Sequence, residues 1–285
     1  YKAAWSSAWQ DSGYFSLAQI ACEKKAYSEA LELVERSLNR NMHNYKARDL
    51  KAALLRKLGR LEEAKRVARE TIQLDIADFG AYNELYLISI ARRERETEDK
   101  AWKARDELTR LMRNDVHNFI ALAVDYGHCG LYEEGVDVLS RLVADANSDA
   151  YPTEDRATAR VAPTFRLPRD ANANSYPMLH YYLGYFYKKL EHSELANAHL
   201  RAASEARPDY CFPNSLDDLV VLESALAANL GDAMAHYYLG NLLYDKKRHT
   251  DAIRHWEASR EANSSFATVH RNLALAYYNV VDRPD

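Results

Sequence analysis

The chain has 285 residues, a formal net charge of −4, and only nine glycines and seven prolines. So small a net charge gives no basic field that would draw the chain to nucleic acid or anionic lipid, and we expect neither as a partner. No apolar run reaches the roughly 18 residues that a membrane-spanning helix needs. All seven prolines lie at or beyond Pro152, and helix-favouring residues are abundant, which favours an all-α protein.

The three cysteines, Cys22, Cys129 and Cys211, are far apart, odd in number and without metal-ligand spacing. We therefore expect buried, reduced thiols, which fit a cytoplasmic protein. The sequence starts without Met, in what looks like the middle of a helix, and ends where another helix should begin. We interpret it as a fragment with both ends cut within a repeat.

In chain order, a small residue recurs at a fixed interval in the first half. Ala30 in "YSEALELV" and Ala64 in "LEEAKRVA" are 34 residues apart. Gly135 in "YEEGVDVL" follows 71 residues after Ala64, which is 34 plus 37. The interval therefore contains one further repeat, which is three residues longer than the others. We place the three additional residues near "RRERETEDK". The sequence predicts four helical hairpins over residues 1–149.

Residues 150–176 interrupt this periodicity with three prolines. We predict a loop insertion there. Two alternatives remain for it: a plain surface loop, or a segment that covers a groove or contacts a partner.

After the loop, the five residues HYYLG occur at 180–184 and again at 236–240. Each copy is followed by a second-helix alanine, Ala196 or Ala252, and these alanines are 56 residues apart, which is 34 plus 22. The unit at 211–232 is therefore truncated, with about 12 residues of its first helix missing. We predict that Pro213 ends the preceding helix and that Asn214 or Ser215 caps the next.

These units resemble tetratricopeptide repeats (TPR), whose pattern is W-x2-L-G-x2-Y, then A-x3-F, then P. His180-x2-Leu183-Gly184-x2-Tyr187 follows it, and so does the stretch from His236, with His in the aromatic first position. The resemblance implies an α-solenoid, the TPR superhelix, of about seven hairpins. The expected units are 11–44, 45–78, 79–115, 116–149, 177–210, the half unit 211–232, 233–266 and a last helix from 267, so that 177–285 forms the C-terminal part.

Catalytic and metal-binding motifs are absent from the sequence, which contains no P-loop, GxGxxG, HExxH, GxSxG or EF-hand loop. The histidine spacings do not match metal-ligand geometry, and His180, His236 and His270 are interpreted as packing residues. We therefore expect neither catalysis nor a cofactor nor a metal ion in this segment.

The first helices of a TPR array line a concave groove, and helical periodicity places positions 2, 5, 9, 12 and 13 of each unit on that face. These positions are rich in tyrosine in the C-terminal units, with Lys, Asn and Arg interleaved. Tyrosine and arginine are enriched at binding hot spots. We predict a partner-binding concave face made by Tyr181, Tyr185, Lys188, Tyr237, Asn241, Tyr244, Arg271 and Tyr278.

A narrower resemblance rests on Trp5, Trp9, Gly13-Tyr14, "KARDLKAALLRKLGR", "PDYCFPN" and "HYYLGNLLYDK". It is similar to the C-terminal TPR arrays of bacterial multidomain proteins in which a mutarotase-like β-domain of unknown function precedes the repeats. This implies a bacterial protein linked to carbohydrate metabolism, with any active site outside this chain.

The leading functional hypothesis is a non-catalytic scaffold whose concave groove binds a peptide or a protein domain, including the protein's own upstream domain. One alternative is an accessory module of a carbohydrate-active protein, with groove tyrosines contacting sugar. Another is a purely structural array that forms homodimers through its repeat ends, because uncapped repeats expose apolar end faces.

Overall fold

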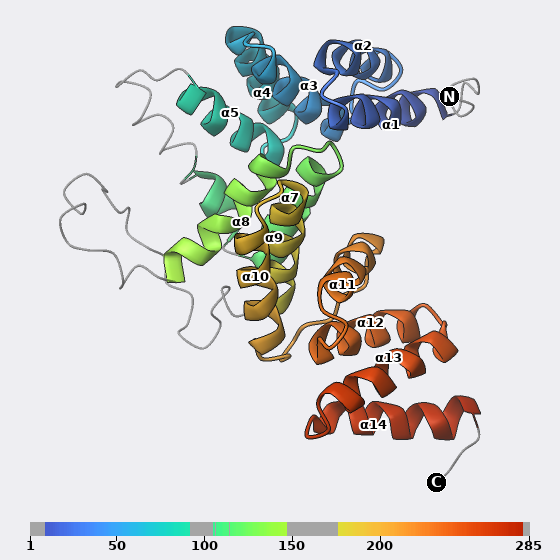
Figure 1. Cartoon of the computed structure of the whole chain (residues 1–285). Coiled ribbons are helices and arrows are strands. Elements are labelled where there is room, and N and C mark those ends of the chain that lie inside the picture. The colour runs from blue at the N-terminus through green and yellow to red at the C-terminus, as the bar shows by residue number, and fades with distance from the viewer. Residues whose placement is uncertain (1–8, 92–104, 106, 114, 147–175, 282–285) are drawn as a thin grey trace, which may run out of the picture. The chain divides into compact units, whose positions relative to one another are not determined.

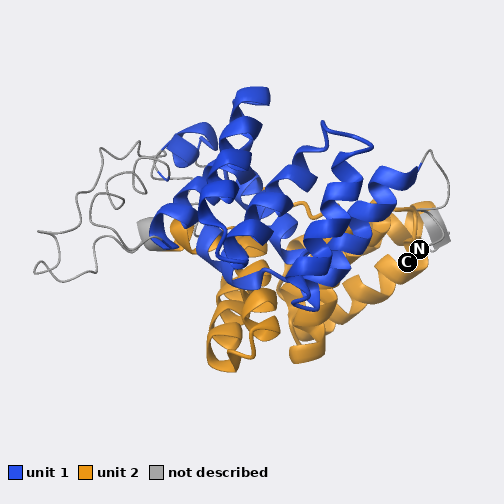
Figure 2. Ribbon diagram, turned by 90° about the horizontal axis from the view of Figure 1, so that it is seen from above, with its two compact units in different colours: residues 1–138, 151–165 blue, residues 139–150, 166–285 orange. Residues whose placement is uncertain are grey.

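The computed structural model describes residues 9–91, 105, 107–113, 115–146 and 176–281. All regular elements in these residues are helices. The chain divides into two compact units (Figure 2), residues 1–138 with 151–165 and residues 139–150 with 166–285. Each unit is a set of antiparallel helices.

Unit 1 contains the helices of the first four predicted repeats (Figure 1). Helix α1 packs on α2, and α3 packs on both α4 and α5. The second helix of the repeat at 79–115 falls mostly outside the described residues. The described helices are α1 (Gln10–Glu23), α2 (Tyr27–Leu38), α3 (Tyr45–Lys57), α4 (Leu61–Leu74), α5 (Phe79–Ala91), α7 (Val116–Gly127) and α8 (Tyr132–Ala146), within which the boundary to unit 2 lies.

Unit 2 contains two full hairpins, one single helix between them and one helix after them (Figure 1). Helix α9 packs on α10, and α12 packs on α13. The predicted loop at 150–176 lies outside the described residues except for Tyr176. The helices are α9 (Pro177–Lys189), α10 (Ser193–Glu205), α11 (Leu216–Ala228), α12 (Ala233–Asp245), α13 (His249–Ala262), α14 (Ala267–Ala276) and a π-helical turn, Tyr277–Val281.

The order of these helices confirms the predicted TPR-type α-solenoid. Glycine is needed where the two helices of a hairpin cross: a methyl group on Gly184 would lie 2.7 Å from Leu200 Cδ2 of the paired helix. At Gly240, the corresponding methyl group would overlap the indole ring of Trp256. Glycine at this position lets a large residue of the second helix pack directly onto the backbone of the first.

One residue in the turn of each described hairpin has a left-handed backbone, always at position 15 of its repeat. Two of these residues are glycines, whereas the other three carry side chains that make a positive φ unfavourable. The five residues are Lys25, Gly59, Gly130, Glu191 and Lys247.

Replacing Lys247 by glycine is expected to stabilise unit 2. Lys247 has φ of 61° and an exposed side chain, so the change removes backbone strain and no buried contact. Loss of the strain stabilises the folded chain, whereas the larger conformational entropy of glycine in the unfolded chain offsets part of this gain. We expect a net rise in the free energy of unfolding of about 0.5–1 kcal/mol. Thermal unfolding of Lys247→Gly beside Lys246→Gly, whose φ is −78°, tests this, and the control variant should be destabilised.

Helix α11 is the one helix within residues 211–232. The preceding helix, α10, already ends at Glu205, so the expectation that Pro213 ends it is corrected. Ser215 is the N-cap of α11: Oγ accepts a hydrogen bond from the Asp218 amide at 3.0 Å, and the Asp218 carboxylate accepts one from the Ser215 amide at 2.9 Å. This capping box satisfies two otherwise unpaired backbone donors. Helix α11 packs against α9 and α12, and Tyr182 donates a hydrogen bond to Asp218 at 2.8 Å.

All three cysteines are free and buried, as the sequence predicts. Burial raises the pKa of Cys22 to about 12 and that of Cys211 to about 11, so both stay protonated thiols at neutral pH. No helix in the described part of the chain has both the length and the apolar character needed to cross a membrane.

Candidate interaction surface

Tyr181 lies in the interior of unit 2, with none of its surface exposed. Its hydroxyl donates to the two carboxylate oxygens of Asp232 at 3.0 and 3.1 Å. Asp232 is the N-cap of α12 and accepts from the amides of Met234 and Ala235. Burial, together with the Asp232 carboxylate, raises the pKa of Tyr181, which keeps the phenol a hydrogen-bond donor. The expectation that Tyr181 is accessible in a groove is therefore corrected, because its hydroxyl ties α9 to α12.

Tyr237 is also buried, with 7 % of its surface exposed. Its ring packs edge-on against Phe266, 4.8 Å between ring centroids, and against Tyr238 at 5.3 Å. Phe266 is the N-cap residue directly before α14, so Tyr237 helps to dock the start of α14 onto α12. The expected groove exposure of Tyr237 is corrected as well.

Tyr185 and Lys188 lie on α9 and remain at least partly accessible. The Tyr185 ring packs against Phe186, and the Lys189 ammonium lies 5.4 Å from its centroid. Lys188 Nζ is 3.4 Å from both the carbonyl oxygen and the hydroxyl of Ser224 on α11. The predicted binding face of α9 is thus partly covered by α11, because the truncated repeat brings this single helix against α9.

Asn241 joins three helices while remaining partly exposed. Its Oδ1 accepts from Trp256 Nε1 on α13 and from Asn272 Nδ2 on α14, each at 3.1 Å. Indole N–H is a donor only, so it fixes the carbonyl end of the Asn241 amide toward Trp256. Nearby Tyr244 is half-buried, with its ring 5.2 Å from that of Trp256 and 4.6 Å from His249.

Arg271 and Tyr278 are exposed, as predicted for binding residues. The Arg271 guanidinium donates to Asn272 Oδ1 at 3.2 Å, so Asn272 connects it to Asn241. Tyr278 is 69 % exposed and Leu275, one turn before it, is 54 % exposed. We define the α12–α14 surface as the residues Asn241, Tyr244, Arg271, Leu275 and Tyr278.

A small cavity of about 140 Å³ lies elsewhere in unit 2, between α11, α12 and α13. Its walls include Glu223, His255 and the ion-paired residues Arg248, Asp251 and Arg254. None of the predicted binding residues lines this cavity. Within the residues that the structure describes, no three His, Cys, Asp or Glu side chains are grouped as ligands for a metal ion.

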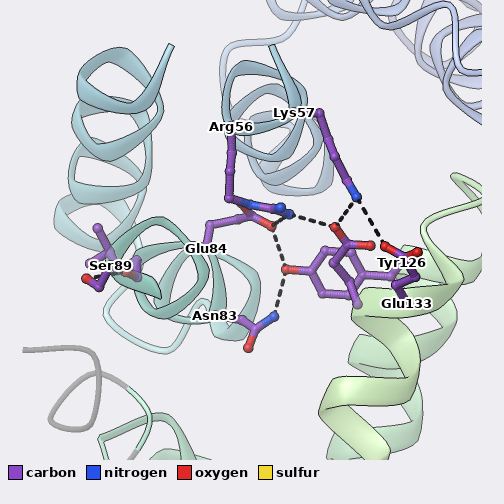
Figure 3. A network of polar contacts seen from close by, with 9 residues as sticks. Arg56, Lys57, Asn83, Glu84, Ser89, Tyr126 and Glu133 are labelled. Carbon is purple, nitrogen blue, oxygen red and sulfur yellow. Dashed lines mark hydrogen bonds and ion pairs between the residues drawn. The ribbon is translucent and has the colours of Figure 1, made fainter. Parts of the chain in front are cut away.

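Unit 1 contains a buried polar network that the sequence analysis missed (Figure 3). Arg56 on α3 donates to both Glu84 oxygens on α5, at 2.7 and 3.0 Å, and to Glu134 on α8 at 3.1 Å. Tyr126 on α7 donates to Glu84 at 2.8 Å, and Lys57 pairs with Glu134 at 2.6 Å. The network connects four helices. The sequence signal is the pair Asn83-Glu84, which interrupts the apolar stretch "FGAYNELYLISIA".

Opposite charges keep Glu134 and Arg56 ionised despite their burial. Burial alone would raise the pKa of Glu134, but Arg56 and Lys57 outweigh it and the pKa is lowered. For Arg56, burial lowers the pKa and the Glu84 carboxylate more than reverses the effect. Because the side chains of Glu84 and Glu134 are at most 5 % exposed, the network acts as internal structure and offers little surface to a ligand.

Comparisons with known proteins give structural likeness only. No family model and no curated protein matches the chain. Similar solved structures include the thermophilic TPR protein TTC0263 of Thermus thermophilus, with 16% identity, TM-score 0.29 and coverage of 94% of this chain and 99% of that chain. YrrB, a TPR protein with an unusual peptide-binding site, has 12% identity, TM-score 0.28 and coverage of 84% and 96%. The Cut9–Hcn1 hetero-tetramer of APC/C has 13% identity, TM-score 0.33 and coverage of 92% and 48%.

Because the TM-scores are low, the functions of these proteins are not carried over to this chain. Its fold rests on its own hairpins: their 34-residue spacing, their small residues at the helix crossings and the common left-handed turn residue.

Proposed function

We propose that the chain is a non-catalytic scaffold that binds an extended peptide segment of a protein partner on the α12–α14 surface. The observation that carries the proposal is the fixed orientation of the Asn241 amide. Its Oδ1 is held by Trp256 and Asn272, so its Nδ2 points away from them and has no partner in the described part of the chain. A partly exposed, oriented amide donor suits a peptide carbonyl oxygen, which is the acceptor that every extended segment presents.

The residues around Asn241 indicate the chemistry of the partner. The Arg271 guanidinium can donate to a carboxylate, and Tyr278 and Leu275 offer apolar surface next to it. These groups favour a peptide with an acidic side chain or a C-terminal carboxylate, flanked by an apolar residue. Tyr185 and Lys188, at the edge of α11, stay candidate contacts for a longer segment.

A peptide library tests this surface directly. Peptides with an acidic residue or a free C-terminal carboxylate beside an apolar residue should bind the full chain, as measured by fluorescence polarisation. The variants Arg271→Ala and Tyr278→Ala should weaken the binding about 10- to 30-fold each, as hot-spot truncations of about 1.5–2 kcal/mol do.

Matched control variants lie on other parts of unit 2. Arg201→Ala removes an exposed arginine of α10, and Tyr210→Ala removes a tyrosine that is 88 % exposed. Both controls should bind like the unaltered chain. Unchanged affinity in Arg271→Ala and Tyr278→Ala, or equal losses in the two controls, would show that peptides do not bind at this surface.

The carbohydrate alternative predicts glycan binding that depends on exposed tyrosine rings. Tyr181 and Tyr237 are buried, and Tyr244 and Tyr185 are partly covered by their neighbours, so Tyr278 is left as the main stacking ring. Glycan-array binding that Tyr278→Ala abolishes, with no peptide bound, would favour that alternative. Light scattering over a range of concentrations tests the dimer hypothesis.

A further inference from the structure

Two pairs of histidine rings connect the two helices of the full hairpins in unit 2. His180 on α9 faces His199 on α10, and His236 on α12 faces His255 on α13. The residues of each pair are 19 positions apart, at equivalent places of the two repeats. The Nδ1 atoms are 3.0 Å apart in the first pair and 2.9 Å apart in the second.

The two rings of each pair point at each other end to end. Their centroids are 5.3 and 5.2 Å apart, which is the Nδ1–Nδ1 distance plus about one ring radius on each side. The two nitrogens therefore lie nearly on the line that joins the centroids. A metal ion would need lone pairs that converge at an angle on a point beside this line. A linear contact of 3 Å is the geometry of an N–H···N hydrogen bond.

The second pair also shows which nitrogen carries the shared proton. His236 Nε2 is 3.1 Å from the carbonyl oxygen of Leu230, which can only accept, so Nε2 carries a hydrogen. In the neutral ring, His236 Nδ1 is then an acceptor, and His255 Nδ1 is the donor. A hydrogen bond of this kind holds one proton between the two nitrogens and has no place for a second.

Charged and titratable side chains and aromatic rings lie next to both pairs. His255 lines the small cavity of unit 2, together with Glu223, Arg248, Asp251 and Arg254. Burial raises the pKa of Asp232, and the nearby His236 ring partly opposes this rise. In the first pair, His180 is buried and the ring of Tyr187 stacks on His199 at 5.4 Å, with His192 on Tyr187 at 6.1 Å.

We propose that the two histidine pairs are a proton-sensitive switch: they join the helices of each hairpin at neutral pH, and protonation of both rings of a pair separates them. Two protonated rings would place two N–H groups 3 Å apart with like charges, which removes the hydrogen bond and adds repulsion. Because the same pair occurs in both full hairpins, acidification loosens both of them together.

The direction in which the pKa values of His199 and His255 are shifted agrees with this mechanism. Burial and the neighbouring His180 lower the pKa of His199 from 6.5 to about 4, and burial and His236 lower the pKa of His255. A histidine with a lowered pKa in the folded state contributes stability that is complete above its unfolded pKa. This stability is lost as the pH falls from 6.5 toward 4, because only the unfolded chain takes up the proton.

The test compares the pH dependence of unfolding in the full chain and in the double variant His199→Asn/His255→Asn. Asparagine keeps an amide near the position of Nδ1 but does not gain a proton, so the hairpin contacts remain. With one excess proton per pair in the unfolded state, each pair should make the folding equilibrium constant of the unaltered chain fall up to about 10-fold more per pH unit than that of the variant. This difference should begin below pH 6.5 and, for the His180–His199 pair, extend to about pH 4.

His270→Gln is the control. His270 occupies the equivalent first-helix position, with Nε2 2.8 Å from the Ser264 carbonyl oxygen, but no second histidine contacts it in the described part of the chain. Its pH dependence should equal that of the unaltered chain. Carboxyl groups such as Asp49, Asp78 and Asp232 are present in the unaltered chain and in every variant. Their contribution therefore cancels when the pH dependences of these proteins are subtracted from one another.

Two results would overturn the proposal. One is an equal pH slope in the unaltered chain and the double variant. The other is a saturable stabilisation by Zn²⁺ or Cu²⁺ at pH 7.5 that the double variant lacks, which would make the pairs metal sites. Nitrogen NMR shifts of the histidine rings give a second readout: one protonated and one unprotonated Nδ1 per pair at pH 7.5 supports the shared proton.

Discussion

Replacing Glu84 by alanine is expected to lower the free energy of unfolding of unit 1 by about 3–5 kcal/mol. Glu84 is fully buried, and it accepts two hydrogen bonds from Arg56 and one from Tyr126. Its removal leaves a guanidinium that is 10 % exposed with Glu134 as its remaining carboxylate partner, and it leaves the Tyr126 hydroxyl without its acceptor. Urea unfolding of the full chain, followed by circular dichroism, measures the loss.

Glu63→Ala is the matched control for this substitution. Glu63 also accepts two hydrogen bonds from an arginine, Arg60, but both side chains are more than 40 % exposed. Solvent screens such an exposed pair, so the control should unfold almost like the unaltered chain. Similar losses in both variants would show that burial does not strengthen the Arg56–Glu84 pair.

A paired replacement separates the value of the ion pair from the cost of an isolated charge. In Arg56→Met/Glu84→Leu, both charges are replaced by apolar side chains of similar size. Buried ion pairs can often be exchanged in this way with little loss, whereas the removal of one partner is costly. We therefore expect the double variant to be more stable than Glu84→Ala.

The repeat pattern predicted the fold well because local sequence determines it. Small residues such as Gly184 and Ala196 are required wherever two helices of a hairpin cross, and their spacing is visible in one sequence. The same holds for the N-cap of α11, where Ser215 and Asp218 are only three residues apart. Features that depend only on residues close together in the sequence could therefore be predicted.

The binding face could be predicted less well because it depends on which later segments of the chain pack over it. Periodicity places Tyr181 and Tyr237 on the expected face of their helices, but it does not show which segments pack there. Tyr181 meets Asp232, 51 residues away, and Tyr237 meets Phe266. The exposed Arg271 and Tyr278 and the partly exposed Asn241 agree with the expected placement, and their role in binding stays a prediction.

The histidine pairs could be predicted from the sequence only in part. The sequence places His180 and His236 at a packing position, and both prove to contact a second histidine 19 residues later. The repetition of this spacing in both full hairpins is a signal that the sequence contains. The end-to-end orientation of the rings, which decides between a proton and a metal ion, comes only from the structure.

Replacing Trp256 by alanine is expected to destabilise unit 2 by about 3–5 kcal/mol, the usual cost for a buried tryptophan. Trp256 is 3 % exposed, packs on Gly240 and Tyr244, and donates to Asn241. The variant removes this packing and releases the Asn241 amide, so peptide binding at the α12–α14 surface should weaken as well. The equivalent variant in the other hairpin, Leu200→Ala, should lower stability without this effect on binding, because Leu200 packs on Gly184.

A double-mutant cycle identifies the Gly240–Trp256 contact as the cause. Gly240→Ala alone should destabilise by about 1–3 kcal/mol through overpacking, because its methyl group would overlap the indole. In the Trp256→Ala background the indole is absent, and the better helix propensity of alanine should make the same change neutral or stabilising. The two costs should therefore be far from additive. Additive costs would mean that Gly240 is required for a reason other than the close approach of Trp256, and the packing rule of these hairpins would have to be revised.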